Sequence, residues 1–517
     1  MEQCDTSRVP ALSNSIRTLL ETHGPCLTSE LIERMSEQGI SSSAARQRIT
    51  RARSEYKRLA GLRFAKNARF IYLEEHFGDA QFWAAMERAF ASSGKSYWGA
   101  VVGLKAKGGR CPKSLFPIIC GAPLSRTGQL SPDRILERLS AINLLEEVQD
   151  EKLGQPYVEF RPHSYFAQSA AETNAVLMAE FVALQGIKDW ARRIGFGSYG
   201  KFRVRDETEL PVVSSVAWDI TAPSYLRPLV SARGGTLRPG FFVCDINLNG
   251  AIDDDQVNLF LRKYDMAAAP INVAPIMPFL VAETFTSSAF DKAKAAGIGA
   301  VTLSNLFGEA VSKALQDLIK LLSDTGATAA VNPEHLARVM AELTKIEGAA
   351  NNLRGALFEL AIGSLVKDVE DGFVRTGYEI TNYLSGRKAE IDVLLDKPDE
   401  KTSLVLECKA KTPGSKVSLA EVQKWYSDRV PLIGETLRQD RHYLDKKLVF
   451  EMWTNATFHE CAWSWLNTQN RSFENYSIAW KDGAEIKRYA QKAKNGAIRK
   501  VLDEHYFKNP LTKLAAA

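Results

Sequence analysis

The sequence predicts a multidomain α/β protein, and three observations support this fold class. At 517 residues, the chain is too long for one hydrophobic core, so about three domains are expected. Helices followed by short strands are predicted up to residue 168, and strands alternate with helices between residues 169 and 325. From residue 343 onward, a helix precedes two apolar strands that carry acidic side chains.

The overall composition is that of a soluble globular protein, with 45% hydrophobic residues, 25% charged residues and a net charge of +5. This mild charge permits a polyanionic partner but does not require one. The seven cysteines include no CxxC pair, which favours free thiols over a zinc site or disulfides. We recognise no signal peptide or membrane-spanning stretch, so we expect a cytoplasmic protein without a membrane partner.

Residues 1–77 contain three helical segments and a pair of short strands. The helices are predicted at Ser13–His23, at Thr28–Gln38 and from Ser41 to about Leu59. The strands, Leu62–Phe64 and Phe70–Leu73, would form a β-hairpin wing. This order resembles a winged helix-turn-helix domain, whose third helix typically enters the major groove of DNA.

Basic residues concentrate on the predicted third helix and the segment after it. Between Ser41 and Arg69, nine Lys and Arg residues accompany a single acid, Glu55. A polyanion would stabilise such a run, because phosphates neutralise the mutual repulsion and release counterions. We therefore predict nucleic-acid contacts by Arg46, Arg48, Arg51, Arg53, Lys57 and Arg58. The alternative is a solvated helix face on a domain that binds protein.

Residues 78–168 predict a second winged helix. The expected helices are Phe82–Ser92, Lys95–Leu104 and Ser131–Ile142, and the expected strands are Leu144–Val148 and Tyr157–Phe160. The intervening segment Lys105–Arg110 (KAKGGR) is expected to be a basic, flexible loop.

The central segment, residues 169–325, alternates strands with helices. The predicted order is strand Phe241–Ile246, helix Asp255–Met266, strand Phe279–Val281, helix Ser288–Ala296 and strand Ile298–Leu303. Alternation of this kind favours an α/β domain with a partly parallel sheet. A linker at Gly326–Ala330 would separate it from a C-terminal domain at residues 343–517.

Acidic residues interrupt two apolar strands of the C-terminal domain. A helix, Glu347–Val366, precedes the strands Ala389–Leu395 and Leu404–Lys411, and the short connection between these strands predicts a hairpin. Side chains alternate along a strand, so Asp392 and Glu407 can face each other across the hairpin. Lys409 and Lys411 lie on the same face as Glu407.

These side chains suit phosphodiester hydrolysis. Carboxylates on apolar strands are costly to bury unless a cation compensates them. Mg²⁺ or Mn²⁺ bound by Asp392 and Glu407 would do so, would act as a Lewis acid and would lower the pKa of a bound water. Lys409 would orient the nucleophile and offset charge in the transition state. Glu359, on the preceding helix, would bind the metal directly or through water.

A helix glutamate followed by EIDVLL (residues 390–395) and VLECK (residues 405–409) resembles the PD-(D/E)xK nuclease superfamily, notably the Holliday-junction resolvases and Mrr-type restriction enzymes. The resemblance covers residues 345–510 and implies a restriction-endonuclease-like mixed sheet flanked by helices. It also implies that Asp392, Glu407 and Glu359 are metal ligands and that Lys409 is the catalytic lysine. The motif departs from the family name at Ile391, which stands where proline would be expected. We further predict that Lys411 contacts nucleic acid.

The central domain has two interpretations. Asp219, Asp245 and Glu283 lie beside its apolar strands, and Glu283-Thr284-Phe285 is similar to a degraded Glu-x-Lys motif. A duplicated, inactive nuclease fold is one interpretation, and an unrelated α/β interaction domain is the other.

Together these patterns predict a metal-dependent endonuclease that acts on DNA, with RNA as the second choice of substrate. Large nucleases of this build resemble antiphage or anti-plasmid effectors, some of which act beside an activating sensor such as a prokaryotic Argonaute. The alternatives are a DNA-binding regulator or scaffold with an inactive nuclease fold, and a partner-activated RNase. The sequence leaves the oligomeric state open.

Overall fold

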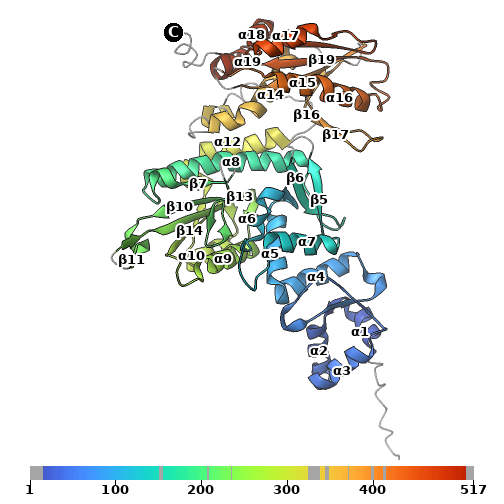
Figure 1. Cartoon of the computed structure of the whole chain (residues 1–517), viewed down its shortest axis with the longest axis vertical. Coiled ribbons are helices and arrows are strands. Elements are labelled where there is room, and N and C mark those ends of the chain that lie inside the picture. Colours follow the sequence, from blue (N-terminus) through green and yellow to red (C-terminus); the bar gives the residue numbers. More distant parts are fainter. Residues whose placement is uncertain are drawn as a thin grey trace, which may run out of the picture.

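The computed structural model describes residues 15–150, 155–205, 209–233, 236–323, 338–339, 341–343, 349–370, 372–397, 401–411 and 415–507. Within these ranges the protein is mixed α/β with several sheets (Figure 1). None of the helices in these ranges is long and apolar enough to cross a bilayer. The predicted linker Gly326–Ala330, and the predicted helix starts at Ser13 and Glu347, lie outside the described residues.

The N-terminal unit packs three helices on a small antiparallel sheet with strand order β1-β3-β2. Its elements are α1 (Ile16–His23), β1 (Cys26–Leu27), α2 (Thr28–Glu37), α3 (Ser42–Arg51), β2 (Lys57–Arg58) and β3 (Phe70–Tyr72). The hydroxyl oxygen of Ser41 accepts the backbone N–H of Ala44, which caps the start of α3.

Two details predicted for this unit are wrong. The third helix ends at Arg51 instead of about Leu59, because the buried Tyr56 turns back and its hydroxyl donates to the Ile49 carbonyl oxygen at 2.8 Å. Strand β3 pairs with β1 and β2, whereas the predicted strand Leu62–Phe64 forms no strand. Leu62 and Phe64 are instead buried in the core that this unit shares with the next one.

The second unit combines four helices with a three-stranded sheet of order β4-β6-β5. Its elements are α4 (Ala80–Ser93), α5 (Lys95–Ala106), β4 (Arg110–Pro112), α6 (Phe116–Cys120), α7 (Pro132–Ala141), β5 (Leu145–Asp150) and β6 (Gln155–Phe160). The predicted flexible loop at Lys105–Arg110 is wrong, since Lys105 and Ala106 end α5, Arg110 begins β4, and the tight turn between them has both of its glycines buried. Gly109 has φ 81°, and a Cβ there would lie 2.0 Å from the carbonyl oxygen of Phe166.

The rest of the chain contains two five-stranded sheets. The central elements are α8 (Ala170–Arg193), β7 (Arg203–Val204), β8 (Val212–Val213), β9 (Val216–Ala217), β10 (Ile220–Ser224), β11 (Ser231–Arg233), β12 (Thr236–Arg238), β13 (Gly240–Ile252), α9 (Asp254–Ala268), β14 (Ile276–Phe285), α10 (Ser287–Ala295), β15 (Gly299–Thr302), α11 (Leu303–Phe307) and α12 (Glu309–Ser323). The C-terminal elements are α14 (Ala349–Val369), β16 (Phe373–Thr381), β17 (Lys388–Asp396), β18 (Thr402–Lys409), α15 (Leu419–Lys424), α16 (Val430–Leu437), β19 (Lys447–Thr454), α17 (Glu460–Thr468), β20 (Tyr476–Lys481), α18 (Gly483–Ala490) and α19 (Gly496–Leu502).

Both sheets have the same topology. Their orders are β7-β10-β13-β14-β15 and β16-β17-β18-β19-β20, and in each the first two pairings are antiparallel and the last two are parallel. In each, a long helix (α8 or α14) precedes the first strand, and helices connect the third strand to the fourth and the fourth to the fifth. Strand β13 therefore corresponds to β18, and β14 corresponds to β19.

This correspondence corrects one interpretation of the sequence. Glu283 lies on β14, where its carboxylate accepts the side-chain N–H of Gln316 at 2.6 Å, so Glu283-Thr284-Phe285 is not the counterpart of Glu407–Lys409. On β13, which corresponds to β18, Asp245 and Asn247 occupy the positions that Glu407 and Lys409 occupy on β18.

Helices α8, α12 and α14 lie between the two sheets and join their cores (Figure 1). One cluster of buried side chains includes Leu184 of α8, Phe242 of β13, Phe358 of α14 and Leu406 of β18. The opposite face of the C-terminal sheet is covered by α15, α16 and α17.

Candidate active site

The pairing of β17 with β18 sets Asp392 against Glu407. Val393 pairs with Leu406 in an antiparallel register, and the same register continued by one residue makes Asp392 the partner of Glu407. Asp392 Oδ2 accepts the backbone N–H of Cys408 at 2.7 Å, so this carboxylate turns toward β18. Both acids are buried, with exposed fractions of 7% and 5%.

Two cations hold the carboxylate of Glu407. Lys409 Nζ lies 2.7 Å from Oε1, and Arg429 Nε lies 2.9 Å from Oε2. Arg429 also donates to the carbonyl oxygen of Glu390 at 2.7 Å. Sequence reasoning missed Arg429, which lies in a π-helical turn, Trp425–Arg429, between α15 and α16. Pro431, two residues later, was a sequence sign of an irregular helix at this point.

The electrostatics of the site follow from this crowding. Burial, and then repulsion by Glu407, raise the pKa of Asp392 from its ordinary 3.8 to about 6. Burial alone would lower the pKa of Lys409, but the carboxylates of Glu407 and Asp392 outweigh burial and raise it. Lys409 is therefore charged at neutral pH, whereas the ionised form of Asp392 is destabilised.

Glu359 is less closely associated with this pair. It lies on α14 and lines a small cavity of about 90 Å³ together with Glu390 and Thr376. Its charge reaches the same strands, because it adds to the effects of burial and of Asp392 that raise the pKa of the Cys408 thiol. Among the described residues, no three His, Cys, Asp or Glu side chains are grouped to hold one metal ion. The structure thus brings Asp392, Glu407 and Lys409 together and leaves Glu359 at the edge of their cluster.

A pocket of about 500 Å³ opens beside Glu407 and Lys409. Its basic lining residues are Arg110, Arg387, Lys388, Lys409, Lys424 and Arg429. Arg110 lies on β4 and Gln149, another lining residue, lies on β5, so the second unit forms one wall of the pocket. This mixture of buried acids and surrounding cations can bind an anionic group beside a pair of carboxylates.

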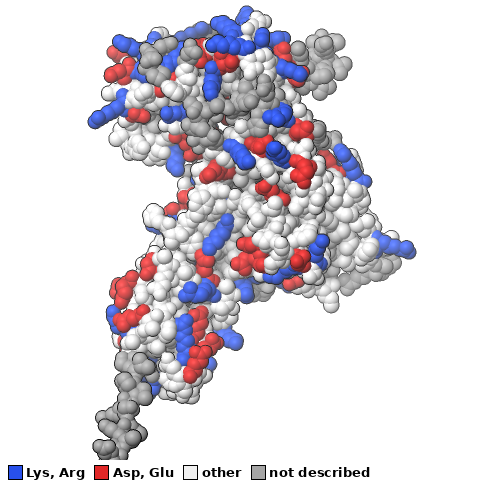
Figure 2. All heavy atoms as spheres, turned by 180° about the vertical axis from the view of Figure 1, so that it is seen from behind, with Lys and Arg blue, Asp and Glu red and all other residues white. Residues whose placement is uncertain are grey.

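The residues predicted to bind nucleic acid are separate from this pocket. Arg46, Arg48 and Arg51 are exposed on α3, Arg53 is exposed in the following turn, and Lys57 and Arg58 are exposed on β2. Lys411 forms an ion pair with Glu421 at 2.6 Å. On the face shown in Figure 2, Lys and Arg lie among Asp and Glu over most of the described surface.

Replacing Asp392 with asparagine is expected to stabilise the metal-free protein at pH 7.5. The folded-state pKa of about 6 exceeds the ordinary 3.8, so ionisation of Asp392 weakens folding progressively between these values and fully above them. The gain from asparagine is on the order of 2–3 kcal/mol at pH 7.5 and vanishes near pH 4. Urea unfolding in EDTA at both pH values measures it, and an equal gain at pH 4 would contradict the electrostatic explanation.

No family model matches the chain, and no curated protein matches it. Comparison with solved structures found, among others, the MspJI restriction endonuclease in complex with a 27-mer oligonucleotide, 16% identical over 35% of this chain and 39% of that chain, with a TM-score of 0.19. It also found the restriction endonuclease FokI, 10% identical over 92% of this chain and 82% of that chain, with a TM-score of 0.20. The chain thus spans about two fifths of the MspJI protein. At these TM-scores neither overlap defines a shared fold, and functional conclusions rest on the geometry of the site.

Proposed function

We propose that the protein is a divalent-metal-dependent nuclease that cleaves DNA at the Asp392–Glu407–Lys409 site. The observation that supports this most strongly is the opposition of two buried carboxylates on adjacent strands, with a lysine ammonium 2.7 Å from one of them at the edge of a 500 Å³ pocket. Two acids and one lysine in this order are what the resemblance to PD-(D/E)xK nucleases requires.

The donor set fits Mg²⁺ or Mn²⁺. Asp392 and Glu407 are buried and repel each other, and this repulsion contributes to the raised pKa of Asp392. A cation between the two carboxylates would relieve the repulsion. Glu359, on α14, would reach the ion through a water molecule, because it is not grouped with the other two acids around one position. When bound, the ion would act as a Lewis acid and lower the pKa of a water ligand.

Side chains of the protein would orient the attacking water and bind the phosphates. Lys409, charged at neutral pH, would orient the attacking water and offset charge on the phosphate. Arg429 would hold Glu407 in position through the bond of Nε to the carboxylate. The basic residues around the pocket would bind the phosphates on either side of the cut.

A regulator that binds DNA without cutting it is the second candidate. The observation in its favour is that both oxygens of Glu407 already bind cations, Lys409 and Arg429, which neutralise the acid without a metal.

Incubation with supercoiled plasmid, linear DNA and RNA in Mg²⁺, Mn²⁺ or EDTA distinguishes these functions. We expect metal-dependent cleavage of DNA that is lost in Asp392→Ala and retained in Asp445→Ala, which changes an exposed aspartate away from the pocket. If the wild-type protein binds Mn²⁺ but cuts nothing, and Asp392→Ala loses this binding, the protein is a nuclease that requires an activating partner. Absence of both cleavage and Mn²⁺ binding would favour the regulator.

The basic surface of α3 is expected to carry much of the DNA affinity. Changing Arg46, Arg48 and Arg51 to alanine should weaken binding and reduce the slope of log affinity against log salt by about three, because each phosphate contact contributes about 0.9. Fluorescence anisotropy of labelled duplex DNA at several salt concentrations measures this slope. The matched control changes Lys487, Arg488 and Lys500, three exposed basic residues of α18 and α19. An equal loss in both triple variants would show that binding is diffuse and not localised on α3.

A further inference from the structure

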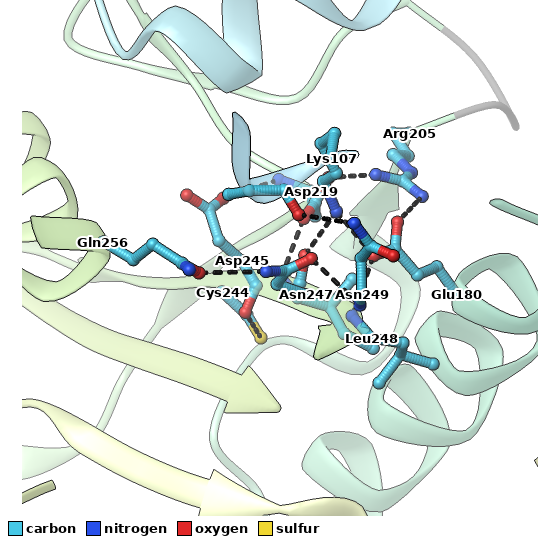
Figure 3. Close-up of polar contacts among 12 residues, drawn as sticks. Lys107, Glu180, Arg205, Asp219, Cys244, Asp245, Asn247, Leu248, Asn249 and Gln256 are labelled. Carbon is cyan, nitrogen blue, oxygen red and sulfur yellow. Dashed lines mark hydrogen bonds and ion pairs between the residues drawn. The ribbon is translucent and has the colours of Figure 1, made fainter. Parts of the chain in front are cut away.

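The central sheet holds a buried cluster of alternating charges (Figure 3). We call it the central charge cluster and define it as Lys107, Glu180, Arg205, Asp219, Asp245 and Lys263. Their side chains are at most 15% exposed. Arg205 joins Glu180 at 2.8 Å to Asp219 at 2.9 Å, and Lys263 pairs with Asp245.

The acids of this cluster occupy the same positions in their sheet as the candidate active site does in the C-terminal sheet. Ile220 pairs with Cys244, so the register continued by one residue sets Asp219 against Asp245, as Asp392 is set against Glu407. Asp219 Oδ2 accepts the backbone N–H of Ile246 at 2.8 Å, and Asp392 Oδ2 accepts that of Cys408 at 2.7 Å.

Two further features repeat. Glu180 projects from α8, the helix before the first strand, as Glu359 does from α14. Lys263 reaches Asp245 from α9, the helix that follows the third strand, as Arg429 reaches Glu407.

The two sites differ at the positions that matter for hydrolysis. Asn247 stands where the C-terminal strand has Lys409, and its side-chain N–H donates to Gln256 at 2.9 Å. Lys107 arrives from the turn after α5, and its ammonium lies 2.5 Å from Glu180 Oε1 and 3.0 Å from the Ile246 carbonyl oxygen (Figure 3). An ammonium thus lies between an acid of α8 and the backbone of the strand that bears Asp245.

We propose that the central domain is an inactivated second copy of the nuclease site, in which the ammonium of Lys107 takes the place of the divalent cation. Three buried carboxylates need compensation, and Lys107, Arg205 and Lys263 supply three positive charges from within the chain. In the part of the chain that the structure describes, this leaves the C-terminal site as the hydrolytic centre. At the former metal position, the ion pair of Lys107 with Glu180 links the second unit to the central domain.

Removal of Lys107 should reopen the cation position. The test uses full-length protein that carries Asp392→Ala, so that the C-terminal site cannot bind metal and the result does not depend on the proposed nuclease activity. Free Mn²⁺ is measured by electron paramagnetic resonance during titration with MnCl₂. With Lys107 intact we expect no saturable binding, and with Lys107→Ala we expect one bound Mn²⁺ per chain.

Two variants make the result specific. Addition of Glu180→Gln should abolish the binding gained by Lys107→Ala, and Lys105→Ala, which removes an exposed lysine paired with Glu87, should gain none. If Lys107→Ala unfolds without metal, MnCl₂ should restore its thermal transition.

Three outcomes would overturn the proposal. They are Glu180-dependent Mn²⁺ binding while Lys107 is present, a folded Lys107→Ala protein that binds no Mn²⁺, and an unfolded one that MnCl₂ does not rescue.

Discussion

Replacing Lys409 with alanine is expected to lower the rate of metal-dependent DNA cleavage by about 10²–10³-fold, the usual effect of removing one group that stabilises transition-state charge. Lys409 Nζ lies 2.7 Å from Glu407 and its pKa is raised by the two acids, so it is a fixed positive charge beside the pocket at neutral pH. Single-turnover cleavage of a labelled duplex measures the rate, and anisotropy at the same salt measures binding.

The control for this variant is Lys416→Ala, which removes an exposed lysine outside the pocket. DNA affinity should fall by no more than about fivefold in either variant, because one charge that is open to solvent contributes roughly 1 kcal/mol or less. Wild-type cleavage by Lys409→Ala would exclude the proposed role. Loss of affinity in step with cleavage would make Lys409 a binding residue instead.

Replacing Arg205 with alanine is expected to destabilise the protein by about 3–5 kcal/mol, since it leaves two buried carboxylates without their shared cation. Arg205 is 1% exposed and joins Glu180 to Asp219. The fall in the urea midpoint of Trp fluorescence, at constant denaturant slope, reports the loss.

Arg203→Ala provides a matched comparison, because this exposed residue of β7 lies two positions before Arg205. It should change stability by less than about 0.5 kcal/mol. Adding Glu180→Gln to Arg205→Ala should recover part of the loss. A small effect of Arg205→Ala alone would mean that water reaches the cluster and that it is not a dry charge network.

Local sequence patterns predicted the elements that carry strong periodicity. Helices α4, α9 and α10 begin and end within about two residues of their predicted limits, because their apolar spacing and capping residues are local signals. The opposition of Asp392 and Glu407 was also predictable, since a short hairpin and side-chain alternation fix it. The roles of these residues in catalysis and of α3 in DNA binding stay predictions.

Contacts between distant segments account for what the sequence did not predict. The two-residue strand β1 is too short to show a period, and its pairing with β3 spans more than forty residues. Lys107 was assigned to a flexible loop because its basic neighbours and two glycines resemble one, whereas its partner Glu180 lies 73 residues away. Arg429 likewise meets Glu407 only through the turn between two helices.

The core that α8, α12 and α14 share couples the unfolding of the two sheets. Leu184 and Phe242 of the central sheet side, and Phe358 and Leu406 of the C-terminal side, belong to one interior. Residues 170–507 should therefore unfold in one cooperative step and not as two independent domains. Unfolding of either sheet would expose apolar side chains of the other to water. A C-terminal fragment cut out at residue 343 would expose the apolar face of α14, so solubility of the excised piece is not to be expected.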